Sequence, residues 1–297
     1  MNRSYAKCRS LVAILLAVLM VFAFLPVFAS AEEPSLEGLA AEYYAGELEG
    51  DDARVAQAAI DVLSGRKVTY TNAAQLARLV KLGYSYNQAD GPISITKAQL
   101  TYDTWSWFHW KTTTVDCYVV CLSGTDVDAE GQTTDWWTDF LSGFEFDNDY
   151  NKNARSVIYS TIPRGANIIF AGHSLGGMIT QQLASDSGIK SAYNVLNTVT
   201  FGSPLINGLK REGMVKRLGD TVDPVPYLSL STFLNIVWQA AGLQREDGGY
   251  GVNIITAHKE SYTRTDVWGD YDPCGEKNGS RRLTLDFSTT TFYHSDY

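Results

Sequence analysis

The stretch Asn167-Ile168-Ile169-Phe170-Ala171-Gly172-His173-Ser174-Leu175-Gly176-Gly177-Met178 decides the fold of this chain. Its first five residues form a short, mostly apolar run that favours a strand, and the residues from Met178 to Ala184 favour a helix. The residues from Gly172 to Gly176 match the pattern G-x-S-x-G. A strand, this turn and a helix in this order predict a tight bend that lifts the Ser174 hydroxyl clear of a sheet. Side chains larger than glycine two residues to either side of the serine would collide in such a bend.

Apolar strands and helices alternate on both sides of this bend. Cys117–Leu122 is almost wholly apolar, which is typical of a central strand covered on both faces. Two further strands are expected at Thr198–Phe201 and Met214–Leu218, and a helix is expected around Asn153–Thr161. We therefore predict an α/β fold with a mainly parallel central sheet and helices on both of its faces.

The first part of the chain, up to Leu122, is expected to contain helices followed by two strands. Residues 35–90 repeat apolar side chains at helical spacing and predict an N-terminal helical segment. Thr101–Lys111 and Thr114–Leu122 are rich in aromatic and β-branched residues, as two adjacent strands would be.

The chain begins with the pattern of a secretory signal peptide. Three basic residues are followed by an apolar stretch from Leu11 to about Phe28, and then by Ala29-Ser30-Ala31 with small residues at the cleavage positions. We expect residues 1–31 to be removed and the protein to be secreted, or associated with the cell envelope. An uncleaved membrane anchor is the alternative. Residues 32–297 have the length of a single domain.

Composition limits the partners and the cofactors. The formal net charge is −9, so an acidic surface argues against nucleic acid or an anionic membrane as a main partner. An odd number of cysteines, Cys117, Cys121 and Cys274, follows the signal peptide and leaves at least one free thiol. Cys117 and Cys121 stand too far apart along a strand to form a bridge with each other, and all three are expected to be buried. No metal-ligand spacing is present, and no cofactor or obligate protein partner is expected.

A serine that attacks a carbonyl carbon needs a base, an acid that orients this base, and donors for the oxyanion. Behind a strand-turn-helix serine such as Ser174, the acid and then the histidine follow in the chain. His258 and His294 are the candidate bases, and Asp220 and Asp223 are the candidate acids. His294 stands near the end of the chain, where structure often frays, and Asp220 follows a glycine as turn residues do. These observations alone decide neither which histidine is the base nor which aspartate is the acid.

Four short segments, with an aromatic Asp-Trp segment downstream of Gly124-Thr125, together resemble the class 3 lipase family, which includes the fungal triglyceride lipases. They are Gly172–Gly177, Thr200–Pro204, Gly124-Thr125, and Asp223-Pro224-Val225-Pro226. The resemblance extends from about Ala73 to Tyr262 and is most specific in its central motifs. It implies an α/β-hydrolase fold and carboxylic ester substrates, often lipids.

The resemblance also implies roles for individual residues. Asp223 and His258 match the family's acid and base. One oxyanion donor is expected from the backbone N–H of Leu175, the residue after the serine. The resemblance places the second donor on Thr125. The family often has an arginine before the glycine of this loop, where this chain has Ser123.

Aromatic residues downstream of this loop are candidates for contact with substrate. Trp136, Trp137 and Phe140 have helical spacing and match the place where related lipases carry a lid. A buried core is the alternative for these residues. Phe233–Trp238 is a second candidate for lining an acyl pocket.

We therefore expect a secreted serine carboxylic ester hydrolase, most consistent with a lipase, that forms an acyl-enzyme on Ser174. Its partners would be an ester or lipid substrate and a lipid interface. Two alternatives remain. An acyltransferase would use the same three residues with an alcohol acceptor, and a binding module on the hydrolase fold would be catalytically silent.

Overall fold

The computed structural model describes residues 35–84, 91–106, 109–124, 149–207, 210–227 and 242–295. The strands are β1 (Lys67–Tyr70), β2 (Ile93–Ser106), β3 (His109–Leu122), β4 (Asn167–His173), β5 (Asn194–Phe201), β6 (Met214–Asp220), β7 (Leu243–Glu246) and β8 (Arg282–Tyr293). The α-helices are α2 (Leu36–Ala45), α3 (Gly50–Ser64), α4 (Ala73–Lys81), α6 (Asp149–Thr161), α7 (Ser174–Ser185), α8 (Ser187–Ala192), α10 (Ile254–Glu260) and α11 (Thr265–Trp268). Two 3-10 helices are η3 (Val225–Tyr227) and η4 (Ser261–Thr263).

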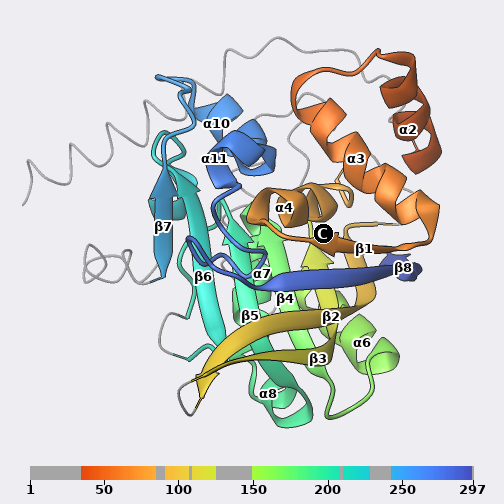
Figure 1. Cartoon of the computed structure of the whole chain (residues 1–297), viewed down its shortest axis with the longest axis vertical. Coiled ribbons are helices and arrows are strands. Elements are labelled where there is room, and N and C mark those ends of the chain that lie inside the picture. The colour runs from red at the N-terminus through yellow and green to blue at the C-terminus, as the bar shows by residue number, and fades with distance from the viewer. Residues whose placement is uncertain are drawn as a thin grey trace, which may run out of the picture.

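One eight-stranded sheet runs through the molecule in the order β1-β8-β2-β3-β4-β5-β6-β7 (Figure 1). The strands from β3 to β7 are parallel to one another. β1, β8, β2 and β3 pair antiparallel. The protein is therefore a mixed α/β fold with a mostly parallel sheet, which confirms the fold class that the alternation of strands and helices predicted.

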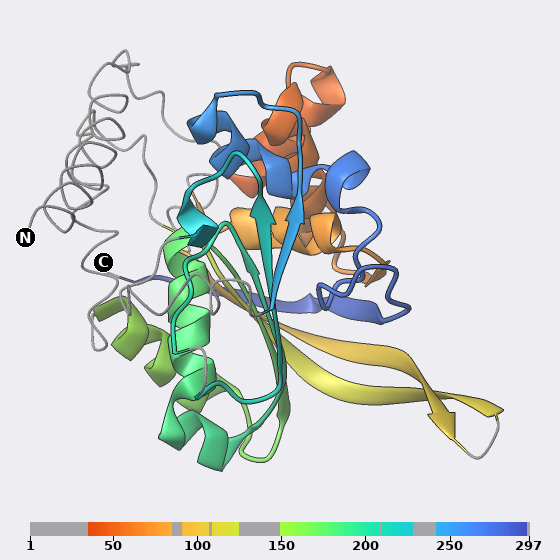
Figure 2. The ribbon, with the colours of Figure 1, turned by 90° about the vertical axis from the view of Figure 1, so that its left-hand side faces the viewer.

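Helices cover both faces of the sheet, so successive residues of a central strand enter two different cores. In β3, Cys117, Val119 and Cys121 are buried in one core, which also contains buried residues of α2, α3, α4 and α11. Val120 and Leu122 are buried in the other core, with residues of α6, α7 and α8. Figure 2 shows α6, α7 and α8 on one side of the sheet and α2, α3 and α4 on the other. This two-sided burial explains why the end of β3 is almost wholly apolar.

Helix α4, which packs on the sheet, has a clear start signal in the sequence. Asn72 accepts a hydrogen bond from the backbone N–H of Gln75, and the Gln75 side chain accepts one from the backbone of Asn72. This reciprocal cap begins α4. Leu76, Leu79 and Val80, three of the apolar residues at helical spacing, are all buried.

Two of the expected boundaries were wrong. The predicted helical segment 35–90 contains the strand β1, because Tyr70 pairs with Leu283 from the other end of the chain. The two strands predicted at Thr101–Lys111 and Thr114–Leu122 are divided elsewhere, because residues 109–113 belong to β3 and the ladder of β2 and β3 continues to the pair Ser106 and His109. Threonines dominate this stretch, and their β-branched side chains extend the strands.

Several predicted features lie outside the described residues. They are the signal peptide 1–31, the oxyanion donor Thr125, the lid candidates Trp136, Trp137 and Phe140, and the acyl-pocket candidate Phe233–Trp238. Within the described residues, no helix has both the length and the apolar character needed to cross a bilayer.

The three described cysteines are free, and all three are buried as predicted. Burial raises the pKa of the Cys117 and Cys121 thiols to about 12. These thiols therefore stay protonated at neutral pH and pack as small apolar groups.

Gly176→Ala should test the close packing of α7 against β3. A Cβ at this position would overlap the carbonyl oxygens of Leu122 and Ser123, which are backbone atoms and cannot rotate away. We expect a loss of about 3 kcal/mol in the free energy of unfolding, measured by urea denaturation. Gly249→Ala is the control, because that glycine has open space around it and only its φ of 77° is unfavourable to alanine. This control should lose about 1 kcal/mol, and equal losses would contradict the packing described here.

Candidate active site

Ser174 lies at the bend between β4 and α7, at the carboxyl edge of the parallel strands. β4 ends at His173 and α7 begins at Ser174, so the chain passes from strand to helix in one step. Ser174 has a φ of 53°, a left-handed conformation that costs a non-glycine residue about 1–2 kcal/mol. Such strain persists only where the surrounding structure holds it, and it is concentrated at functional sites.

Two glycines make this bend possible. A Cβ at Gly172 would lie 2.5 Å from the carbonyl oxygen of Gly176, and a Cβ at Gly176 would overlap the end of β3. The bend is therefore packed backbone against backbone. The residues after β3 approach the same point, since a Cβ at Gly124 would lie 3.1 Å from the Cβ of Ser174.

A buried chain of hydrogen bonds leads from Ser174 through His258 to Asp223. Nε2 of His258 lies 3.0 Å from Oγ of Ser174, and Nδ1 lies 2.9 Å from Oδ2 of Asp223. All three residues are buried. An ionised carboxylate only accepts hydrogen bonds, so Nδ1 carries the ring proton and Nε2 accepts from the serine hydroxyl. This geometry allows His258 to remove the proton of Ser174.

Asp223 is held by two further donors. The backbone N–H of Val225 donates to Oδ1 at 2.9 Å, and the hydroxyl of Tyr262 donates to Oδ2 at 2.5 Å. Burial and the nearby carboxylate of Asp223 hold the pKa of Tyr262 well above its usual range, so this hydroxyl remains a donor. The carboxylate is thus fixed in the orientation in which Oδ2 faces His258.

Asp220, the competing candidate acid, has a different set of contacts. It accepts hydrogen bonds from the backbone of Val222 at 2.9 Å and of Gly248 at 3.0 Å, and from the Ser261 hydroxyl at 2.6 Å. Its own backbone N–H donates to the Tyr262 hydroxyl at 3.1 Å. Asp220 therefore joins the end of β6 to the segments on either side of α10, while Asp223 is the carboxylate that contacts His258.

His173, the variable position of the serine motif, packs directly against His258. The two ring centroids are 4.8 Å apart, and Nε2 of His173 lies 3.0 Å from the backbone oxygen of His258. Because a carbonyl oxygen only accepts, Nε2 carries the proton and Nδ1 accepts from the hydroxyl of Tyr84. Burial, with a smaller contribution from His258, keeps the pKa of His173 well below its usual value, so its ring is neutral. A neutral ring adds no positive charge beside the catalytic candidate His258.

The N-terminal helices fix the segment that carries His258. Lys81 of α4 donates to the backbone oxygen of Lys259 at 2.7 Å, and it also pairs with Asp51 of α3. Arg78 donates to the backbone oxygen of Thr263 at 2.9 Å. Helices from the first third of the chain therefore hold the segment that follows His258 by its backbone.

One of the two predicted oxyanion donors lies in the described structure. Leu175 is the second residue of α7, and backbone N–H groups in the first turn of a helix have no partner within that helix. The positive end of the helix dipole also faces this point. Gly124 ends the described part of the loop that contains Thr125 and lies beside Ser174. Among the described residues, no group of three or more His, Cys, Asp or Glu side chains could hold a metal ion.

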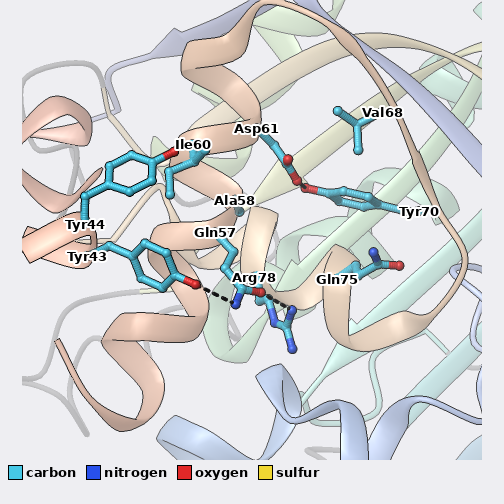
Figure 3. A pocket seen from close by; sticks show the side chains of 10 residues that line it. All are labelled: Tyr43, Tyr44, Gln57, Ala58, Ile60, Asp61, Val68, Tyr70, Gln75 and Arg78. Atoms are coloured by element: carbon cyan, nitrogen blue, oxygen red, sulfur yellow. Dashed lines mark hydrogen bonds between the residues drawn. The ribbon is translucent and has the colours of Figure 1, made fainter. Parts of the chain in front are cut away.

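A separate hollow of about 400 Å³ opens between α2, α3, β1 and α4 (Figure 3). Ser174, Asp223 and His258 are not among the residues that line it. Its polar side chains bond to one another: Gln57 donates to Tyr43 and accepts from Arg78, and Tyr70 donates to Asp61 at 3.0 Å. This mutual pairing is consistent with a structural role for these groups.

Of the predicted site residues, Ser174, His258 and Asp223 lie together, and Leu175 lies beside them. His294 does not take part in this hydrogen-bond chain. The sequence did not predict the contact of Tyr84 with His173 or that of His173 with the backbone oxygen of His258, because these contacts join segments that meet only in the folded chain. Comparison with protein-family models gives no match for this chain, and comparisons with curated proteins and with solved structures give no significant match.

The neutral His173 should make stability depend on pH. In the unfolded chain this histidine takes up a proton below about pH 6.5, whereas the folded site resists protonation, so stability falls as the pH falls through this range. Urea denaturation between pH 8 and pH 5 should show a loss of up to about 1.4 kcal/mol per pH unit from this group. His173→Gln retains a donor toward the backbone oxygen of His258 but does not titrate, so its stability should depend less on pH. An identical pH dependence in both proteins would contradict a neutral His173.

Proposed function

We propose that this protein is a serine carboxylic ester hydrolase of the α/β-hydrolase type, similar to the class 3 lipases. The single observation that carries the proposal is the hydrogen-bonded chain from the strained Ser174 through His258 to the buried Asp223. A hydroxyl, a neutral imidazole and an orienting carboxylate in this order are the groups that acyl transfer requires. The expected secretion of the protein is part of the same proposal.

In the first half of the reaction, His258 accepts the proton of Ser174 as Oγ attacks the ester carbonyl carbon. The new C–O bond forms while the carbonyl π electrons move to oxygen, and backbone N–H groups near Leu175 stabilise the resulting negative charge. Asp223 stabilises the imidazolium. Collapse of this intermediate breaks the ester C–O bond, and the alcohol leaves with the proton from His258.

In the second half, water replaces the alcohol. His258 accepts a proton from water as its oxygen attacks the acyl-enzyme carbonyl, and collapse breaks the bond to Oγ. The proton returns to Ser174, and the carboxylic acid departs. An acyltransferase would differ only in this step, with a second alcohol in place of water. Product analysis with added alcohol would distinguish the two reactions.

Ser174→Ala and His258→Ala should each abolish turnover. Removal of the nucleophile or the base from such a unit lowers kcat by about 10⁶-fold. The measurement is hydrolysis of a p-nitrophenyl ester series of increasing chain length, with and without an emulsified interface. A fluorophosphonate probe should label the wild-type protein and spare Ser174→Ala. If the probe labels both proteins equally, or neither, the proposed nucleophile is wrong.

Substitution of Asp223 should lower activity, whereas substitution of Asp220 should mainly lower stability. Asp223→Asn should lower kcat by about 10⁴-fold, because an amide no longer favours the tautomer with the proton on Nδ1 of His258. Asp220→Asn leaves the contact to His258 in place but weakens hydrogen bonds from Ser261 and Gly248. It should cost about 1–3 kcal/mol in the free energy of unfolding and change kcat by less than about tenfold. An inactive Asp220 variant beside a fully active Asp223 variant would reverse the assignment.

A further inference from the structure

The β2–β3 hairpin extends beyond the rest of the sheet (Figure 2). On one side, β8 pairs with β2 only as far as Thr101, and on the other, β4 pairs with β3 only from Tyr118 onward. Between Tyr102 and Ser106, the described part of β2 pairs with β3 alone. These five residue pairs extend roughly 17 Å past the last pair with β8.

The stem of this hairpin is polar. Thr101 and Thr114 form a hydrogen bond across the strands at 3.0 Å, and Thr112 donates to Asp103 at 2.6 Å. Thr104 donates to the backbone oxygen of Lys111 at 3.3 Å. Cross-strand contacts of this kind stabilise the stem without an apolar core, so the stem can remain in water.

The end of the hairpin is aromatic. Trp105 and Trp110 face each other across the strands, and their side chains are 58% and 69% exposed. In the sequence, Trp107 and Phe108 follow between them, outside the described residues. Polarity therefore changes along the length of the hairpin, from a polar stem to an aromatic end, and not from one face to the other. An element of this kind can place its end in an apolar phase while its stem stays hydrated.

Three properties of this end favour a lipid surface. Tryptophan rings concentrate at the boundary between water and hydrocarbon. In the described part of the chain, residues 102–106 of β2 pair with β3 alone, so the outer edges of this ladder have unpaired backbone groups, and these groups stay hydrated in the headgroup layer where tryptophan rings concentrate. The residue pairs directly behind the tryptophans contain one acid, Asp103, and one base, Lys111, so their charges cancel.

The ring geometry disfavours a polysaccharide as the partner. The two tryptophan rings are 5.3 Å apart and inclined by 68°, an edge-to-face arrangement. A row of sugar rings would stack on coplanar aromatic faces, whereas a lipid headgroup layer accepts rings in any orientation. The net charge of −9 in turn disfavours a surface of anionic lipids.

We propose that the aromatic end of the β2–β3 hairpin attaches the protein to an electrically neutral lipid surface through Trp105 and Trp110. This attachment point is distinct from the candidate active site. β3 begins with His109 near the aromatic end and finishes at Leu122, just before the residues beside Ser174. Its 14 residues separate the two sites by roughly 45 Å. The attachment point is therefore separate from the catalytic edge, and attachment does not depend on hydrolysis.

The test measures flotation of the full chain with phosphatidylcholine vesicles, in a Ser174→Ala background so that no lipid can be hydrolysed. Trp105→Thr/Trp110→Thr should lower the partition constant at least tenfold. Threonine is a good strand former and matches the stem. Tyr44→Thr is the matched control, because Tyr44 is an aromatic residue of α2 with 74% exposure, and its loss should change the partition constant by less than twofold.

Circular dichroism and the unfolding midpoint check that the double variant is folded. If it is not, the single variant Trp110→Thr retains Trp105 and should still lower the partition constant about threefold. Quenching of tryptophan fluorescence by brominated phosphatidylcholine should be weaker in the double variant than in its parent. Addition of phosphatidylserine to the vesicles should not increase binding.

Other outcomes would overturn the proposal. They are equal flotation of the parent and the double variant, equal loss in the Tyr44 control, and binding that requires phosphatidylserine. Retention on an insoluble polysaccharide without vesicle binding would assign the aromatic end to a different partner. Dimerisation that the double variant abolishes, again without vesicle binding, would assign it to a second copy of the chain. None of these results bears on hydrolysis by Ser174.

Discussion

The close approach of the first turn of α7 to the ends of β3 and β4 is the constraint on which the rest of the site depends. Only glycine at positions 172 and 176 leaves room for backbone to pack on backbone there. This contact holds Ser174 in a left-handed conformation that it would not adopt alone. The same contact aims the beginning of a helix at the serine, so the position of the hydroxyl and the electrostatic field around it have one structural cause.

Around this bend, buried polar groups form hydrogen bonds with one another. Tyr262 connects the two acids, since its hydroxyl donates to Asp223 and accepts from the backbone of Asp220. Nε2 of His173 donates to the backbone oxygen of His258, and Nζ of Lys81 donates to the backbone oxygen of Lys259. A buried network in which donors have acceptors is rigid, because every displacement would break a bond that water cannot replace. The imidazole is thus held in place before any substrate binds.

Local patterns in the sequence predicted the parts of the structure that have local causes. The apolar run 167–171, the glycines of the bend and the helix after them follow from steric rules within a dozen residues, and all formed as expected. β1 could not be predicted in this way, because its partner strand lies about two hundred residues away. The residues alone left Asp220 and Asp223 open, the resemblance favoured Asp223, and the loop after β6 places Asp223 against His258. The contact of Tyr84 with His173 could not be predicted, because it joins two segments that meet only on folding.

The last strand of the chain, β8, lies between β1 and β2. β1, which follows α2 and α3 in the chain, therefore pairs with a strand that lies more than two hundred residues later. Pairings between such distant segments form slowly, because a long loop must close before they can add stability. During synthesis, β1 cannot pair with β8 until the more than two hundred residues between them have been made. The fold thus favours late pairing of β1 with β8.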